Sequence, residues 1–485
     1  MHVIIHSMVD YDPKEIFKEP IFMDTIPENI DISEEKYEGI SPYLPFIQNW
    51  DSNIVDIIYW SKPEKEEEFV LKLLRKGSIE FIGRITEIKI RSPIEFIARL
   101  SNRVDVVFDE DTLKKNNPDM KDKDLVDVLG EVMKARLLYL NIVKEKRKGR
   151  HKFYVRSYMD LAKVELRTKE LLEIKEKYKV NWFDLFLCAI GINPFDANNE
   201  EYVILRDIYL PRVLSLFPIK LNDDFTKYTH TLQFTKPGTG KTTFYVKLIN
   251  IMRIAIFGKF PSRTRLVMDA RSGSLGAIFH NDYIVIDAFD KNLEKDKFDD
   301  FISIAESGLA QGVWHIEKGS TSSKSERDAI KRDVGFIFLG NVDKINNETL
   351  TDFVKDSREW LRGELTKRGL SPGSISALLD RLAIVSIMDV DFDVNKYLID
   401  KTMSAPYFMA MINQIKQDIF KAKYNSVKLS DLKGRARSFA IMIVKKLRGL
   451  GFRAIADDPE TDVKEGYLEN IAKEIVKGTF RWKNG

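Results

Sequence analysis

Lys236-Pro-Gly-Thr-Gly-Lys-Thr-Thr243 is the stretch that decides the fold, because its composition is that of a loop that wraps phosphate groups. In such a loop, backbone N–H groups surround the phosphates, the lysine (Lys241) reaches the β- and γ-oxygens, and the next hydroxyl (Thr242) binds Mg²⁺. The apolar run at 231–235 predicts a strand before the loop, and residues 243–252 predict a helix after it. A phosphate-binding loop requires this context, although threonine here replaces the first glycine of the usual pattern.

A second apolar run, residues 283–286, is followed by Asp287 and predicts a buried strand that ends in a metal-binding carboxylate. In ATPases with a phosphate-binding loop, the next residue supplies the glutamate that polarises the attacking water. The chain has Ala288 at that position. A general base contributes about 10² to 10⁴ in rate, so its absence predicts nucleotide binding with poor turnover. Asp290 is the nearest other carboxylate, and on an extended segment it faces away from Asp287.

Composition limits the class of protein. The chain has 485 residues, too many for one hydrophobic core, so we expect two or three domains. With 44% hydrophobic and 31% charged residues and no run of 18 apolar residues, it has the composition of a soluble protein without a membrane partner. The N-terminus has no secretory or transit pattern, which predicts a cytoplasmic location. The one cysteine, Cys188, lies in an apolar run, so a disulfide is excluded and a cysteine zinc site is disfavoured.

The first third of the chain predicts a β-rich domain, an OB-like barrel that binds DNA. Residues 78–90 and 103–108 alternate between apolar and polar side chains at the strand period. Small barrels of this kind bind nucleic acid on one face. The expected domains are this barrel at residues 1–160, a helical connector at 161–225, an α/β ATPase core at 226–392, and a helical lid with a C-terminal extension at 393–485.

A basic hairpin is predicted within the first domain, because apolar runs at 137–143 and 153–158 flank a polar tip. The tip, residues 144–152, carries six Lys or Arg side chains against one Glu, and Tyr154 and Tyr158 are available for stacking on bases. Since the net charge of the chain is only +3, contacts with nucleic acid must come from such local patches. A solvated tip that keeps the chain soluble is the alternative. The DNA contacts expected here are Lys146, Arg147, Lys148, Arg150 and Lys152.

Residues 334–341 predict another buried strand, and its last residue is Asn341. ATPases of this class place a polar side chain at this point, where it senses the γ-phosphate of the nucleotide. An asparagine that only caps the backbone is the alternative.

Three segments resemble the minichromosome-maintenance (MCM) replicative helicases. Residues 286–291, Ile-Asp-Ala-Phe-Asp-Lys, are similar to the I-D-E-F-D-K segment of that family, with alanine in place of glutamate. Residues 302–308 resemble its I-S-I-A-K-A-G helix, and residues 377–382 resemble the L-L-S-R-F turn that carries an arginine finger. Archaeal MCM helicases usually carry a zinc ribbon as well, which a chain with one cysteine cannot build.

Other segments resemble the Lon-related AAA+ ATPase of BREX phage-defence systems. Residues 182–194 are similar to its W-x-D-L-L-x-x-x-G-x-x-P opening, and residues 306–312 are similar to its E-S-G-x-x-x-G segment. Residues 338–341 and 379–381 match its F-x-G-N and L-D-R motifs. That ATPase continues into a Lon-like domain, and no room for one is left after about residue 450.

Both families are ring-forming AAA+ ATPases, so the resemblance implies an α/β P-loop core with a helical lid that binds ATP and Mg²⁺. It also implies self-association into a hexameric or similar ring, possibly a double ring. Asp287 and Thr242 would hold Mg²⁺, and Asn341 would act as sensor 1. The residues implied to cradle ATP are Pro237, Gly238, Thr239, Gly240, Lys241, Thr242 and Thr243.

The same resemblance implies roles for three arginines. Arg381 would be the arginine finger that reaches the γ-phosphate bound by the neighbouring subunit, which is worth about 10³ to 10⁵ in rate. A structural ion pair with Asp380 is the alternative for this residue. Arg435 or Arg437 would be sensor 2, and the sequence does not choose between them.

Residues 314–334 correspond in these families to a presensor hairpin that projects into the pore of the ring. Basic side chains there would contact DNA phosphates, an interaction that salt weakens strongly. A solvated loop is the alternative. The implied DNA contacts in this hairpin are Lys318, Lys324 and Arg327. A second insertion, at residues 251–280, could line the same pore with Arg263, Arg265 and Arg271.

The leading interpretation is an ATP-driven DNA translocase or helicase, acting as an MCM-like hexameric ring in mobile-element DNA replication or in defence. A Lon-like protein remodeller without a protease domain is one alternative, and a non-hydrolysing DNA clamp with native Ala288 is another. Our hypothesis is that Ala288 replaces a glutamate and holds the ring with ATP bound. Stimulation of ATP hydrolysis by DNA or by unfolded protein would separate the translocase from the remodeller.

Overall fold

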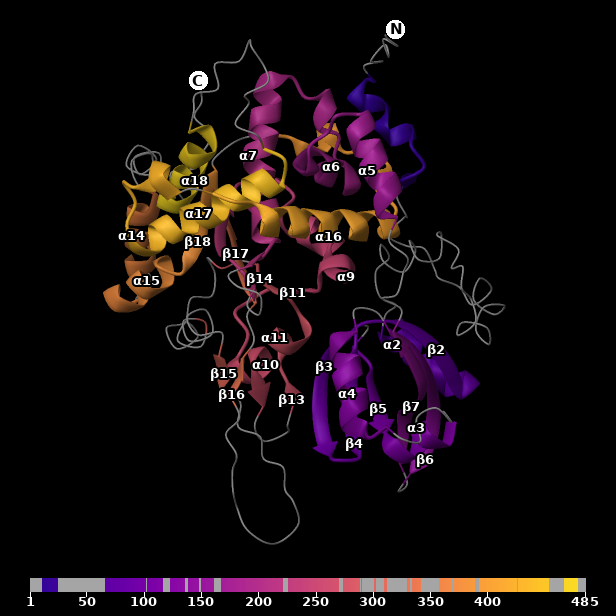
Figure 1. The fold of residues 1–485 in the computed structure, drawn as a ribbon. Helices are drawn as coiled ribbons and strands as arrows, with labels where there is room; N and C mark the ends of the chain where they lie inside the picture. The colour runs from indigo at the N-terminus through magenta and orange to yellow at the C-terminus, as the bar shows by residue number, and fades with distance from the viewer. Residues whose placement is uncertain are drawn as a thin grey trace.

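A computed structural model gives the fold of the chain (Figure 1). None of the helices within the described residues is long and apolar enough to cross a membrane. The described residues are 11–24, 66–101, 103–116, 123–135, 138–147, 150–160, 167–220, 226–269, 274–287, 289, 301, 309–311, 329–331, 334–341, 357–367, 370–388, 392–424, 426–452 and 466–478.

A five-stranded parallel sheet forms the centre of the ATPase part, in keeping with the α/β core that the resemblance implies. Its strand order is β11-β14-β17-β10-β18, so the strand before the expected phosphate-binding loop lies between two strands that come later in the chain. Because all neighbours are parallel, every carboxyl end lies at the same edge of the sheet. The strands are β10 (His230–Thr235), β11 (Ile254–Phe257), β14 (Tyr283–Ile286), β17 (Gly335–Asn341) and β18 (Leu382–Met388).

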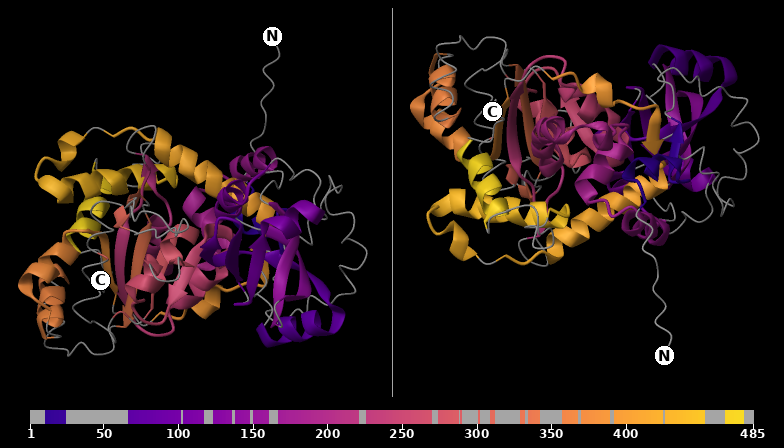
Figure 2. Two further views of the ribbon diagram at one scale, coloured as in Figure 1. Left: turned by 90° about the horizontal axis from the view of Figure 1, so that it is seen from below. Right: turned by 90° about the horizontal axis from the view of Figure 1, so that it is seen from above.

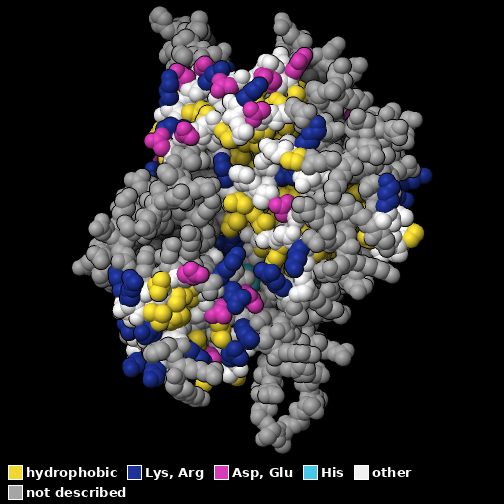
Figure 3. All heavy atoms as spheres, turned by 180° about the vertical axis from the view of Figure 1, so that it is seen from behind, with side chains coloured by type: hydrophobic (Ala, Val, Ile, Leu, Met, Phe, Trp, Pro, Cys, Tyr) yellow, Lys and Arg dark blue, Asp and Glu magenta, His cyan; other side chains and the backbone are white. Residues whose placement is uncertain are grey.

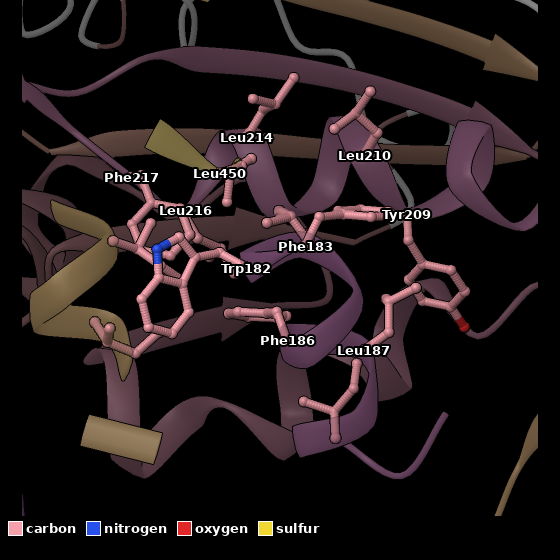
Figure 4. Packing of buried hydrophobic residues seen from close by; sticks show 14 of the residues in the cluster. Trp182, Phe183, Phe186, Leu187, Tyr209, Leu210, Leu214, Leu216, Phe217 and Leu450 are labelled. Carbon is pink, nitrogen blue, oxygen red and sulfur yellow. The ribbon is translucent and has the colours of Figure 1, made fainter. Parts of the chain in front are cut away.

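Helices cover both faces of this sheet (Figure 2). Alternate side chains of a strand point to opposite faces, so Val285 and Ile337 enter one core while Ile284 and Phe336 enter the other. The first core contains Trp182, Phe186 and other aromatic side chains in close contact (Figure 4). Its helices are α5 (Thr168–Lys177), α6 (Trp182–Ala189), α7 (Asn199–Ser215), α8 (Lys241–Lys247), α9 (Ile249–Met252), α16 (Ala405–Lys421), α17 (Gly434–Gly449) and α18 (Tyr467–Lys477). The second face carries α10 (Arg263–Leu266), α11 (Ala277–His280), α14 (Ser357–Lys367) and α15 (Pro372–Leu379).

An eight-stranded sheet forms most of the N-terminal part, with the order β12-β13-β3-β4-β5-β7-β6-β2. A single residue, Arg84, links β2 at one end of this order to β3 near the other end, so the sheet must curl (Figure 1). The strands are β2 (Ser78–Gly83), β3 (Ile85–Ser92), β4 (Glu95–Leu100), β5 (Asp105–Asp109), β6 (Leu138–Arg147), β7 (Arg150–Asp160), β12 (Met268–Asp269) and β13 (Ser274–Leu275). The helices beside them are α2 (Glu66–Lys76), α3 (Glu110–Asn116) and α4 (Leu125–Lys134).

The strands predicted for the N-terminal part are present, with two differences. Residues 78–90 form two strands that Arg84 separates, and the hairpin of β6 and β7 is paired up to Arg147 and Arg150. The two strands at one end of the sheet, β12 and β13, however, come from the insertion at residues 251–280. Ser274 and Leu275 of β13 pair with Lys89 and Ile88 of β3. The insertion that we expected to line a pore therefore extends the N-terminal sheet.

The buried guanidinium of Arg84 joins the two sheets at a second place. It donates to the carbonyl of Ile249 in α9 and, at 2.7 Å, to Oδ1 of Asn281 just before β14. Asn281 in turn donates to the carbonyl of Ala277 at 2.8 Å. The N-terminal sheet is thus fixed to both segments that flank the insertion.

The N-terminal residues lie outside the expected barrel domain. That domain was expected to begin at residue 1, but β1 (Phe22–Asp24) pairs with β19 (Lys401–Met403), and Ile16 and Ile21 are buried in the core of the ATPase part. Residues 11–24 therefore pack with the helices of the first core of the ATPase part, and not with the N-terminal sheet. The short elements are η1 (Pro13–Lys18), β1 (Phe22–Asp24), η5 (Pro194–Asp196), β8 (Ile219–Lys220), β9 (Thr226–Lys227), β15 (Leu309–Gln311), β16 (Ala329–Lys331), η6 (Val394–Tyr397), β19 (Lys401–Met403) and η7 (Ser426–Leu429).

Candidate nucleotide site

The loop between β10 and α8 has the backbone shape of a phosphate-binding loop. Gly238 and Gly240 have φ angles of 81° and 68°, in the left-handed region that glycine adopts without strain. A Cβ at Gly238 would meet open space, whereas one at Gly240 would lie 3.6 Å from the hydroxyl of Tyr209. Successive N–H groups in such a turn can form a concave site for an anion.

The side chain of Lys241 joins the loop to the end of β17. Its Nζ donates to the carbonyls of Thr235 at 2.9 Å and Lys236 at 3.3 Å, and to Oδ1 of Asn341 at 2.7 Å. The two strands are neighbours, and Thr235 is directly opposite Asn341 in their register. The structure therefore brings the expected phosphate-binding lysine and the expected sensor asparagine into contact.

Thr242 and Asp287 also meet, because β14 ends at the same edge of the sheet. The Thr242 hydroxyl donates to Oδ2 of Asp287 at 2.8 Å. The backbone N–H of Asp287 donates to the carbonyl of Phe257 at 2.9 Å, which fixes the start of this turn. A hydroxyl and a carboxylate are oxygen ligands of the kind that Mg²⁺ prefers. This pair, next to the lysine, fits Mg²⁺ bound to the phosphates of a nucleotide.

Several expected site residues lie outside what the structure describes. Ala288 itself is one of them, although both of its neighbours are described. Phe289 is buried, and its N–H donates to the carbonyl of Leu339 in β17 at 2.8 Å. The basic residues Lys148, Lys318, Lys324 and Arg327 also lie outside the described residues, as do Arg271 and the side chains of Arg147, Arg150 and Arg263.

A buried arginine beneath the loop was not predicted. Arg212 of α7 is 1% exposed, and its Nη1 donates to the carbonyl of Thr239 at 2.9 Å. The ring of Tyr209 lies 4.8 Å from its guanidinium carbon. The available signal was an arginine within the apolar stretch 208–217, where a charge needs a specific partner.

Arg381 lies far from the loop of its own chain. It follows α15 and precedes β18, and its Nη1 donates to the carbonyl of Ala377 at 2.6 Å. In the parallel pair of β10 and β18, Leu382 is opposite His230, at the end of β10 away from the loop. The six residues of β10 span about 20 Å at about 3.3 Å per residue. Any contact of Arg381 with a nucleotide phosphate therefore requires a second subunit.

The two sensor 2 candidates begin α17. Arg435 is exposed and Arg437 is half-buried, while the same helix is fixed to the ATPase core near its other end by Lys446. The Nζ of Lys446 is completely buried and donates to the carbonyl of Leu214 at 2.8 Å and to the Thr229 hydroxyl at 2.7 Å. Eleven residues of helix, about 16 Å, separate Arg435 from this anchor.

Titration of Lys446 is expected to make stability depend on pH. Burial lowers the pKa of Lys446 from 10.5 to about 7. The folded protein therefore binds this proton less readily than the unfolded chain, so stability should rise with pH between about 7 and 10.5. Unfolding by denaturant across this range should show the rise in the wild type and a smaller one in K446M. An equal pH dependence in both proteins would contradict this assignment.

The basic hairpin is present, but Tyr154 is not available for stacking and Tyr158 is engaged with neighbouring residues. Tyr154 is 2% exposed, because β7 lies between β5 and β6 and its ring packs against Val107 and Val143. The hydroxyl of Tyr158 donates to Oε2 of Glu131 at 2.6 Å, and its ring lies edge-on to Phe108. The prediction of stacking was wrong for Tyr154, whose ring is buried in the sheet, while Tyr158 is half-buried beside Phe108.

Basic side chains remain exposed on this sheet. Lys146 is exposed near the end of β6, and Lys152 is exposed on β7 with its Nζ 3.8 Å from Oε1 of Glu95. Seen from behind, Lys and Arg side chains are spread over the N-terminal part with acidic and hydrophobic side chains between them (Figure 3). On this face, the charge of the described residues is thus mixed rather than uniformly positive.

Comparison with known proteins identifies the ATPase part. Residues 153–444, more than half of the chain, match the family model described as "Lon-like protease BrxL-like, ATPase domain". The chain is 31% identical over 192 residues to the uncharacterized protein ORF425 of Acidianus filamentous virus 2 (isolate Italy/Pozzuoli), an alignment that covers 40% of the chain and 43% of the viral protein. It is 21% identical over 411 residues to the uncharacterized protein 440 of Sulfolobus islandicus rod-shaped virus 1, covering 82% of each.

Proposed function

The chain belongs to the family of BrxL-like ATPase domains of Lon-like proteases, and from this we propose that it is an AAA+ ATPase that binds Mg–ATP and works on DNA as a ring-shaped translocase or helicase. The observation that carries nucleotide binding is the meeting of three strand ends. Lys241 contacts Asn341, and Thr242 contacts Asp287, all at one edge of a parallel sheet. Ligands of open α/β sheets bind at this edge.

Each of these residues has a definite task in the proposal. The Lys241 ammonium, held by two carbonyls and Asn341, turns to the β- and γ-phosphates when nucleotide binds. Asn341 then offers its amide to the γ-phosphate, and Thr242 and Asp287 hold Mg²⁺. When bound, Mg²⁺ neutralises charge on the phosphates. Arg381 of each subunit acts on the nucleotide of a neighbour, which is why the proposal includes a ring.

DNA binding is supported by the exposed basic side chains of the N-terminal sheet. The contacts proposed there are with the phosphate backbone alone, because Tyr154 and Tyr158 are engaged within the protein. Such contacts release counterions, so their affinity falls steeply with salt. The proposed DNA residues are Lys146, Arg147, Lys148, Arg150 and Lys152 of the predicted hairpin, and Lys318, Lys324 and Arg327 of the segment that is predicted to be a presensor hairpin.

A protein remodeller is the second candidate, and the description of the family as Lon-like favours it. The two candidates differ in which polymer stimulates ATP hydrolysis. We expect single- or double-stranded DNA to stimulate hydrolysis by a hydrolysis-competent variant, and unfolded protein to have no effect. Stimulation by unfolded protein alone would exclude the DNA proposal.

Salt-dependent DNA binding tests the hairpin directly. We expect the affinity for a DNA duplex, measured by fluorescence anisotropy with ATP present, to fall as salt rises. In K146A and K152A the slope of log affinity against log salt should shrink by about 1 per substitution. Lys169 on α5, 91% exposed and 3.8 Å from Glu173, provides the matched control. Equal slopes for K146A, K152A, K169A and the wild type would remove the hairpin from the DNA interface.

A further inference from the structure

We propose that Arg212 is a positioning residue for nucleotide binding, which orients the phosphate-binding loop from beneath and places a fixed positive charge behind it. This inference rests on the proposed binding of ATP at the loop. Arg212 lies outside the matched motifs and is 1% exposed within α7. Its guanidinium donates to two atoms of one loop residue, the carbonyl of Thr239 at 2.9 Å and its Oγ1 at 3.3 Å.

The bond to the Thr239 carbonyl sets the direction of an N–H group. A peptide unit is planar and trans, so its carbonyl and its N–H point in opposite directions. Because Arg212 holds the carbonyl of Thr239 beneath the loop, the N–H of Gly240 points to the upper side, where phosphates would bind. Without this bond the peptide can rotate and turn a carbonyl oxygen, which repels phosphate, toward the site.

The side chain of Thr239 is fixed in the same network. Its hydroxyl is 2.8 Å from Oγ1 of Thr235 and 3.1 Å from the carbonyl of Lys236. The loop is therefore tied to β10 through Thr235 and to α7 through Arg212. An anion that binds the loop would meet a backbone that is already in place.

The charge of Arg212 has no acidic partner among the described residues. Its neighbour on α7, Arg206, pairs with Asp207 at 2.7 Å, whereas Arg212 has a carbonyl, a hydroxyl and the ring of Tyr209. Burial lowers the pKa of Arg212, because a buried charge is disfavoured without a counter-charge. Nucleotide phosphates would supply that counter-charge, so the phosphate-bound state is the electrically balanced one.

The test compares R212K and R212M with R206M, a matched control on the same helix. Affinities for ATP and for inorganic pyrophosphate are measured by calorimetry at constant ionic strength, with thermal unfolding in parallel. We expect R212K to weaken both affinities at least tenfold, since lysine keeps the charge but lacks the fork that holds both atoms of Thr239. R212M should bind both ligands more weakly still. R206M should lower the unfolding temperature without changing either affinity.

Two results would overturn the inference. One is wild-type affinity for ATP and pyrophosphate in R212K, which is expected to fold because it keeps the buried charge. The other is a lower unfolding temperature in R212M with unchanged affinities, which would make the arginine purely structural. If the wild-type protein itself bound neither ligand, the proposed function would fail instead, so the two failures are distinguishable.

Discussion

Replacement of Ala288 by glutamate is expected to raise the rate of ATP hydrolysis by about 10² to 10⁴. The reason is that the rest of the site is in place: Lys241 contacts Asn341, and Thr242 contacts Asp287. Phosphoryl transfer depends on positioning and charge stabilisation together with a residue that orients the attacking water. In our hypothesis, Ala288 occupies the position of the carboxylate that would do this. Steady-state release of phosphate, compared between the wild type and A288E, measures the effect.

The control keeps the new carboxylate and removes the metal ligand. A288E with D287N should lose the gained activity, whereas ATP affinity should be similar in the wild type and A288E, because a water-polarising group does not bind the ground state. An unchanged rate in A288E, with ATP bound, would contradict the hypothesis that Ala288 stands in a glutamate position. The chain would then be a non-hydrolysing clamp that uses nucleotide only to assemble.

The centre of the site could be predicted from sequence because its signals are local. A strand, a glycine-rich loop and a helix follow one another between residues 231 and 252, and Asp287 and Asn341 each end an apolar run. When such strands are parallel neighbours in one sheet, their carboxyl ends lie at the same edge. The contacts of Lys241 and Thr242 follow from that rule.

Features that depend on distant parts of the chain were not predictable in this way. Tyr154 is buried because β7 lies inside its sheet, and strand order cannot be read from one strand. Within the described residues, the insertion pairs with β3, more than 180 residues earlier, through two residue pairs. Arg212 meets Thr239 because α7 packs on β10, and no local pattern encodes that contact. The sequence therefore predicts which residues form the site better than it predicts the distant residues that hold them in position.

Removal of Arg381 is expected to lower ATP hydrolysis by about 10³ to 10⁵ when tested in the active A288E background. An arginine finger stabilises the charge that develops on the transferred phosphoryl group. R362A, which removes an exposed arginine from α14, is the matched control and should retain activity. Since the Arg381 side chain also bonds the carbonyl of Ala377, unfolding curves must show that R381A remains folded. Full activity in folded R381A would make Arg381 a structural residue.

Mixing two inactive variants shows whether this arginine acts between subunits. A288E/R381A keeps the proposed phosphate-binding loop intact, and A288E/K241A keeps Arg381 but lacks the lysine that we propose to bind phosphate. Because the end of β10 near Arg381 is about 20 Å from the loop, one chain cannot use both groups on the same nucleotide. Mixed rings should therefore regain hydrolysis at interfaces where a K241A subunit offers Arg381 to the loop of an R381A subunit. Mixed assemblies that form but stay inactive would argue against action in trans, and with it against the ring as the active form.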